Sequence, residues 1–208
     1  MRRLFRLALR SGIILGAALE IFALSLGNCR RVVRVTRSLD ARLLPSVTIN
    51  KKGELSCLAL IPVKALFVDH WERGACAVSD TPHFELVQGL LDGSDRSEGY
   101  KQYMELQYGM KPRETRLLTS NFTGLANLYV IRRPKFVIEV TIVDWKYLLV
   151  RDGFHRLAIV AANGLEDAIL GRVNFCPLSE ETVQNRVFQR KLHPPGLIQK
   201  YRERILQR

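Results

Sequence analysis

Residues 147–164, YLLVRDGFHRLAIVAANG, decide the fold of this chain. The apolar run 147–150 predicts a strand, residues 151–153 predict a turn, and 155–163 have the apolar spacing of a buried helix. Gly164 then predicts the stop of that helix. A strand that turns directly into a helix presents the first helical amides at the end of the strand, where a ligand can reach them.

The turn between this strand and helix has the chemistry of an anion site. The first amides of a helix have no intrahelical partner and carry a partial positive charge. Gly153 allows close backbone approach, and His155 and Arg156 add side-chain donors, of which Arg matches phosphate oxygens bidentately. Asp152 could hold the turn, orient His155 or Arg156, or help to bind a metal. The alternative is an ordinary strand–turn–helix with a surface Arg and a capping Asp.

Further elements follow from apolar spacing outside this stretch. We expect strands over 58–63, 136–142 and 169–175, and helices over 82–91, 100–108, 112–130, 179–190 and 197–205. Asp80 or Thr81 is expected to cap the first of these helices, with Pro82 in its first turn. Residues 38–56 are interpreted as a linker, and residues 69–82 as polar and irregular.

The net charge of +12 lies at the two ends of the chain. Residues 1–42 carry +7, residues 186–208 carry +6, and −1 is left for residues 43–185. A nearly neutral body argues against a nucleic-acid-binding domain with a basic stripe, so DNA is the less favoured partner. The four cysteines are widely spaced, which indicates free thiols in a reducing compartment and excludes a disulfide scaffold.

The N-terminal segment is apolar between two clusters of arginines. The run 11–28 approaches the length of a membrane span but contains Glu20, an expensive carboxylate at bilayer depth. Three alternatives are a helix lying on an anionic surface, a true span or secretory signal, and a helix docked on the domain. We expect residues 1–37 to lie off the core and to contact an anionic membrane surface, with the protein in the cytoplasm.

The turn resembles the signature of the ParB/sulfiredoxin superfamily, in which a strand ends in a DGxHR-like turn that opens a helix. Residues 152–156, DGFHR, followed by 157–159, LAI, are similar to that signature. Residues 63–66, the run 82–84 and the pair Tyr100 and Tyr103 are similar to other parts of the group. The resemblance covers about residues 58–176, and its specific part is the turn.

The resemblance implies an α+β fold, a small mixed sheet with packed helices, plus an N-terminal helix. It divides the chain into an N-terminal helix and linker (1–42), the superfamily domain (43–178) and basic C-terminal helices (179–208). In this superfamily the turn binds nucleotide phosphates. The implied cofactor is therefore ATP or another nucleotide, with Mg²⁺ as a companion ion.

Carried over by position, Gly153, Phe154, His155 and Arg156 would bind the phosphates, and Asp152 and His155 would be catalytic. Phe154 occupies the place of the reactive cysteine of sulfiredoxins, which excludes that repair chemistry. The ParB version of the turn and a following helix-turn-helix domain are missing, which argues against chromosome partitioning.

Two functions remain open at this point. One is a kinase-like phosphotransferase; the other is a non-catalytic module that senses a nucleotide or binds DNA. Additional candidate site residues are His83, Lys64 and Glu72, and the carboxylate that orients an acceptor would come from Asp69, Glu72 or Glu85. A carboxylate opposite His155 and Arg156 would favour the enzyme, and a closed or acid-free pocket would favour the binding module.

Overall fold

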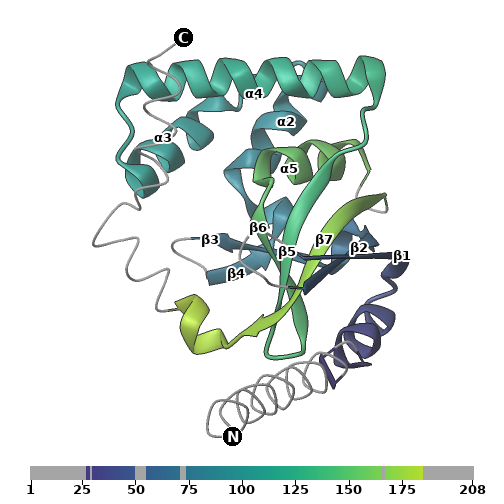
Figure 1. Ribbon diagram of the computed structural model, residues 1–208. Helices are drawn as coiled ribbons and strands as arrows, with labels where there is room; N and C mark the ends of the chain where they lie inside the picture. The colour runs from purple at the N-terminus through teal and green to yellow at the C-terminus, as the bar shows by residue number, and fades with distance from the viewer. Residues whose placement is uncertain (1–26, 29, 50–54, 71–73, 165–166, 185–208) are drawn as a thin grey trace, which may run out of the picture.

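A computed structural model describes residues 27–28, 30–49, 55–70, 74–164 and 167–184. Within these residues seven strands form one mixed sheet in the order β1-β2-β7-β5-β6-β3-β4. Helices α2 to α5 gather at one end of the molecule, and α5 packs directly on the sheet (Figure 1). The expected α+β class, with a small mixed sheet and packed helices, is confirmed.

The strand pairing combines both directions. The pairs β3/β6 and β5/β7 are parallel, and the other neighbours are antiparallel. The strands are β1 (Arg42–Ile49), β2 (Leu55–Pro62), β3 (Leu66–His70), β4 (Gly74–Ala77), β5 (Val137–Val143), β6 (Tyr147–Asp152) and β7 (Ala168–Leu178), and two 3-10 turns, η1 (Val63–Ala65) and η2 (Val78–Asp80), flank β3 and β4.

Capping residues, prolines and glycines mark several of the helix ends. They are α2 (Pro82–Asp92), α3 (Ser97–Tyr108), α4 (Pro112–Arg132) and α5 (Phe154–Asn163). Thr81 caps α2 by accepting the amide of Phe84, and Pro82 stands in its first turn, as expected. Gly93 and Gly109 end α2 and α3 in the left-handed conformation that favours glycine.

Helix α5 lies at the centre of the hydrophobic core. Residues 157–161 are all buried, so this part of the helix is apolar on nearly every side. It packs against α2 and β5 and also contacts α4 and both 3-10 turns. The expected helix over 155–163 and the stop at Gly164 are confirmed, and the position of α5 fixes the turn that precedes it.

The linker expected over residues 38–56 is wrong, because residues 42–49 form β1 along one edge of the sheet. The sequence RLLPSVTI lacks clean alternation and contains Pro45, which an edge strand tolerates because one side of it makes no ladder hydrogen bonds. Likewise, part of the segment interpreted as irregular forms the end of β3 and the short edge strand β4.

The described end of the N-terminal segment belongs to the core, against the expectation for residues 1–37. Residues 30–38 are helical, and Val32 and Val35 are buried in the main hydrophobic cluster. Arg31 lies over the ring of Trp145 at 5.5 Å, as a cation–π contact requires. Val32 and Val35 lie on one face of this helix and pack into the main hydrophobic cluster, so this part of the segment belongs to the domain. The rest of the N-terminal expectation falls on residues 1–26 and 29, outside the described residues.

The start of the expected helix after Ser179 is confirmed. Residues 180–184 are helical, and the Ser179 hydroxyl accepts the amide of Thr182 at 3.1 Å. Val183 is buried in a second, smaller cluster with Val143 and Leu149. The expected helices beyond residue 184 lie outside the described residues, and no helix in the described part is long and apolar enough to cross a membrane.

Two glycine-to-alanine substitutions test how tightly the sheet is packed: one in strand β7 of the sheet, and a comparison at an exposed position of helix α4. In β7, an added methyl at Gly171 would overlap the side chain of Ile61 and come within 3.2 Å of Val140. Gly171→Ala should therefore lower the free energy of unfolding by about 1–3 kcal/mol. Gly124 in α4 has nothing within 4 Å of an added methyl, so Gly124→Ala should raise it by up to about 1 kcal/mol.

Urea unfolding of both variants and of the wild type measures these changes in the free energy of unfolding. A Gly171→Ala protein as stable as the wild type would show that the sheet is not packed as described at this position.

Candidate functional site

Two parallel strands end side by side at the candidate site. Strand β3 ends in Asp69 and His70, and its parallel neighbour β6 ends in Arg151 and Asp152. Side chains alternate between the two faces of a strand. His70 therefore lies on the face of Val68, which belongs to the main core, and Asp69 lies on the opposite face. Only the histidine of this pair faces the helices.

The turn after β6 requires a glycine. Gly153 is buried and has a φ of 98°, a left-handed conformation that L side chains rarely adopt. An added Cβ would lie 2.7 Å from the Cγ2 atom of Ile138 on β5. Glycine therefore allows β6 to turn directly into α5 while the backbone stays close to β5.

Arg156 holds the turn together. Its guanidinium donates to the Asp152 carboxylate at 3.1 Å and to the backbone carbonyl of Val137 on β5. The side chain is 33% exposed, so part of the guanidinium still faces solvent. Sequence reasoning gave Arg156 a ligand-binding role; the structure shows in addition that it links α5 to the ends of β5 and β6.

The N-terminus of α5 differs from those of the other described helices α2, α3 and α4. Those three carry an acid in the first turn, respectively Glu85, Glu98 and Glu114. Helix α5 has a glycine as N-cap, no side-chain cap and no acid in its first turn. The partial positive charge at the start of α5 therefore has no acid beside it in the first turn of the helix, and Asp152, just before the turn, pairs with Arg156.

Behind the turn, aromatic and histidine rings from several elements form one buried group, here called the His–Tyr cluster. It brings together three of the four histidines of the chain. Its members are His70, His83, Tyr100, Tyr103, Phe122 and His155.

Close contacts connect the members of the His–Tyr cluster. The Tyr100 hydroxyl lies 2.7 Å from His155 Nε2, and the rings of His83 and His155 are 5.1 Å apart. Phe122 lies edge-on to His155 at 4.4 Å. His155 is the partly exposed member, and the others are buried. The cluster thus places one histidine between the protein interior and the turn.

Both central histidines are neutral near pH 7. Burial is the main cause that lowers the pKa of His83 well below its usual value, and the neighbouring His155 and His70 add to it. Burial also lowers the pKa of His155 to about 4, against the opposing effect of Asp152. The Nδ1 atom of His83 is buried without a hydrogen-bond partner. A neutral His155 can donate or accept one hydrogen bond at the turn but brings no charge to it.

The structure brings together most of the predicted site residues. Asp152, Gly153, Phe154 and Arg156 form the turn with His155, and His83 lies 6.1 Å from the Phe154 ring.

Lys64 does not join the site. It lies in η1 before β3, and because β3 and β6 are parallel it stands at the opposite end of the sheet from the turn. Glu85 lies beside Gly99 of α3, and Glu72 lies outside the described residues. The structure therefore gives Lys64 no role at the turn, and it shows no described carboxylate opposite His155 and Arg156 among the candidates.

Sequence reasoning missed Tyr100 and Phe122 as partners of His155. The helical spacing of Tyr100 identifies it as a core residue, but its hydrogen bond spans 55 positions of the chain. No local pattern carries that information. In the described residues, no group of three histidine, cysteine or acidic side chains is placed to hold a metal ion.

Comparisons of the chain with protein-family models, with curated proteins and with solved structures found no match.

The buried histidines predict a pH-dependent stability. Because the folded pKa values of His83 and His155 lie below the unfolded value near 6.5, the unfolded state binds more protons in acid. The free energy of unfolding should be fully present above about pH 6.5 and should fall as the pH drops towards 5.

His83→Phe isolates one of these contributions. The ring fits an aromatic environment, and the Nδ1 atom it removes has no partner to lose. The variant should lose less stability than the wild type between pH 6.5 and 5 in denaturant titrations. If the free energy of unfolding falls by the same amount in the two proteins between pH 6.5 and 5, His83 is not held neutral by the fold.

Proposed function

We propose that this protein binds the phosphate groups of a nucleotide at the start of α5. The observation that carries the proposal is the N-terminus of α5, which has neither a side-chain cap nor an acid and follows a glycine that the fold requires. Such a terminus favours an anion, because the amides and the helix dipole together attract negative charge.

The donors at this site come from three consecutive residues. The amides of Phe154, His155 and Arg156 occupy the first turn of α5. The Arg156 guanidinium is held in place by Asp152 and the Val137 carbonyl, so little side-chain entropy remains to be lost when a phosphate binds. A donor that is already positioned supports tight binding of a phosphate.

His155 adds a neutral donor. When the Tyr100 hydroxyl donates to Nε2, the imidazole proton lies on Nδ1 and can be donated to a phosphate oxygen. Because the pKa of His155 is about 4, this donor stays in one protonation state through the neutral range. The Tyr100–His155 pair thus supports recognition of a phosphate without a change in charge.

We favour a nucleotide-binding module over a phosphotransferase. Asp152 pairs with Arg156 on the same turn, Asp69 is on the other face of the sheet, and Glu85 lies beside α3. A transfer enzyme uses a carboxylate to orient the acceptor, and these positions offer no such group opposite the turn. The resemblance to the ParB/sulfiredoxin superfamily supports a nucleotide as ligand, with Mg²⁺ bound through its phosphates. The widely spaced cysteines support a cytoplasmic location.

Titration of ATP, ADP, CTP and GTP, with and without Mg²⁺, tests the proposal by thermal shift and calorimetry. In the presence of the best ligand, Arg156→Ala should weaken binding about tenfold or more, through the loss of a charge-assisted hydrogen bond. Arg156→Lys should recover part of the affinity. Arg132→Ala, which removes an exposed arginine at the end of α4, is the matched control and should bind like the wild type.

A second variant is needed because Arg156 both binds the phosphate in this proposal and stabilises the turn through Asp152 and the Val137 carbonyl. Asp152→Asn removes the negative charge beside the site, so the affinity for Mg²⁺-free nucleotide should rise, by about two- to fivefold for a partly screened charge. Wild-type affinity in Arg156→Ala would contradict a phosphate site at the turn. Loss of nucleotide transfer or hydrolysis in Asp152→Asn, together with weaker binding, would favour the enzyme.

A further inference from the structure

A cavity lies between helices α2, α3 and α4, towards the end of α2 that is far from the turn. It has a volume of about 520 Å³ and opens between the end of α2, the loop that follows, the start of α3 and the middle of α4. The residues of α2 and its C-cap that line the cavity run from Leu86 to Gly93, which is about 4.5 to 15 Å of helix rise beyond His83 at the start of α2. The cavity and the turn are therefore separate features of one helical layer.

One wall of the cavity is a polar stripe on α4. Its members, Arg116, Thr119, Ser120 and Thr123, recur at the i, i+3, i+4, i+7 spacing that puts residues on one face of a helix. A face that packs on neighbouring helices is normally apolar. Thr119 donates to the carbonyl of Thr115, whereas the hydroxyls of Ser120 and Thr123 make no hydrogen bond within the described residues. The stripe therefore presents donors to the cavity rather than to other protein groups.

Cations converge on the cavity from three elements. Arg96 comes from the loop, Lys101 from α3 and Arg116 from α4. Arg96 is paired with Asp92 at 2.5 Å, and Lys101 is 4.0 Å from Glu98. Arg116 makes no ion pair among the described residues. The Arg116 guanidinium is therefore available to an anion, and Arg96 and Lys101 can each donate further hydrogen bonds from the side that faces away from their acidic partners.

The one carboxylate that lines the cavity already has partners. Asp95 accepts the amide of Ser97 at 2.9 Å. A hydrogen bond from the Ser97 side chain, followed by this backbone hydrogen bond, lowers the pKa of Asp95. Its negative charge serves the start of α3. Because Asp92 and Glu98 pair with Arg96 and Lys101, Arg116 is the cation of the cavity that has no ion-pair partner within the described residues.

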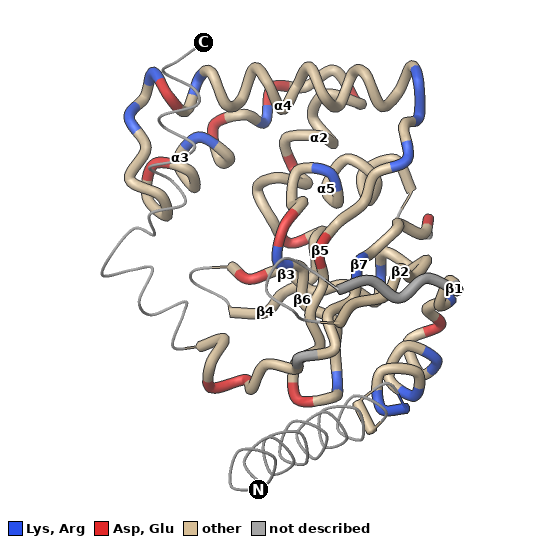
Figure 2. Tube along the Cα trace, in the orientation of Figure 1, with Lys and Arg blue, Asp and Glu red and all other residues tan. Residues whose placement is uncertain are grey.

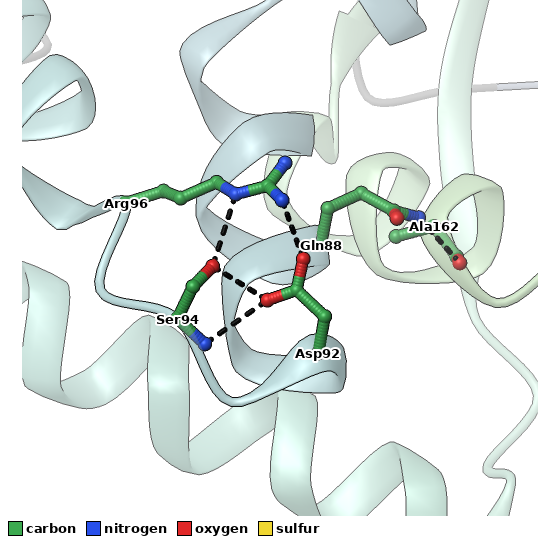
Figure 3. Close-up of polar contacts among 5 residues, drawn as sticks. All are labelled: Gln88, Asp92, Ser94, Arg96 and Ala162. Atoms are coloured by element: carbon green, nitrogen blue, oxygen red, sulfur yellow. Dashed lines mark hydrogen bonds and ion pairs between the residues drawn. The ribbon is translucent and has the colours of Figure 1, made fainter.

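The loop that lines the cavity after α2 is held by hydrogen bonds and an ion pair, which Figure 3 shows for Asp92, Ser94 and Arg96. The Asp92 carboxylate accepts from the Ser94 amide and hydroxyl, and Arg96 donates to the Ser94 hydroxyl at 3.0 Å. The loop also packs on Gly89, where an added Cβ would lie 2.6 Å from the Ser94 carbonyl oxygen. Gln88, on the same helix, reaches across to the carbonyl of Ala162 and ties α2 to α5. The cavity is thus preformed, which reduces the entropy lost on binding.

We infer that this cavity binds a small organic phosphate, with Arg116 as its principal charge partner and the hydroxyls of Ser120 and Thr123 as neutral donors. Arginine and hydroxyl groups together match phosphate oxygens. Leu86 and Leu90 give the cavity an apolar side that fits the carbon part of such a ligand. The volume suits a molecule of metabolite size rather than a macromolecule.

Calorimetric titration of the full chain with inorganic pyrophosphate, without Mg²⁺, tests this site. Arg156→Ala weakens binding at the turn, so the cavity contributes a larger share of the pyrophosphate binding that remains in this background. Adding Arg116→Ala to that background should weaken the remaining binding about tenfold or more. Adding Arg132→Ala instead, on the opposite side of the same helix, should leave it unchanged.

A variant that introduces a negative charge gives an independent test. Ser120→Glu places a carboxylate on the exposed rim of the polar stripe and should abolish pyrophosphate binding in the same background. The matched control Leu106→Glu adds the same charge on α3 at a residue that is 70% exposed and does not line the cavity.

Two outcomes would overturn the proposal. One is loss of all pyrophosphate binding in Arg156→Ala alone, and the other is equal binding with and without Arg116. If the turn itself binds no phosphate, Arg156→Ala will match the wild type while Arg116→Ala still loses binding, so the two proposals fail separately.

Discussion

The close approach of Gly153 to Ile138 is the constraint on which the rest of the site depends. It lets the chain leave β6 and enter α5 with no intervening loop, and no side chain would fit in that position. Because α5 then lies at the centre of the core, the direction of its first turn is fixed by burial of residues 157–161. Arg156 adds a contact to β5, so three elements hold one short turn.

The same constraint places the His–Tyr cluster. His155 follows Gly153 by two residues, and the start of α5 orients its ring towards α3, where Tyr100 is fully buried. His83 reaches the same point from the start of α2. Figure 2 shows acidic and basic residues along α3 and α4, whereas the His–Tyr cluster is built of uncharged rings. Positive charge at the turn therefore comes from Arg156 and the helix dipole rather than from the histidines.

Much of this architecture can be predicted from the sequence where local rules dominate. Thr81 with Pro82, Gly93 and Gly109 mark helix ends through backbone chemistry that acts over a few residues, and the structure has each of them at a helix end. The helix after Gly153 also follows from local spacing, whereas the expected turn over 151–153 is shortened to Gly153, because β6 runs on to Asp152. β1 could not be predicted in this way, because its pairing with β2 supplies the hydrogen bonds that its own residue pattern does not announce. Lys64 failed as a site residue for a similar reason: only the parallel pairing of β3 with β6 shows which end of the sheet it occupies.

The central claim is that the backbone amides at the start of α5 bind phosphate, and amide NMR measures this directly. In ¹⁵N-labelled full-length protein titrated with ATP, the amide signals of Phe154, His155 and Arg156 should shift progressively and saturate together. Amides at the start of α4, where Glu114 accepts the Lys111 amide, should stay in place. Saturable ATP binding that leaves the three α5 amides unshifted would contradict the account.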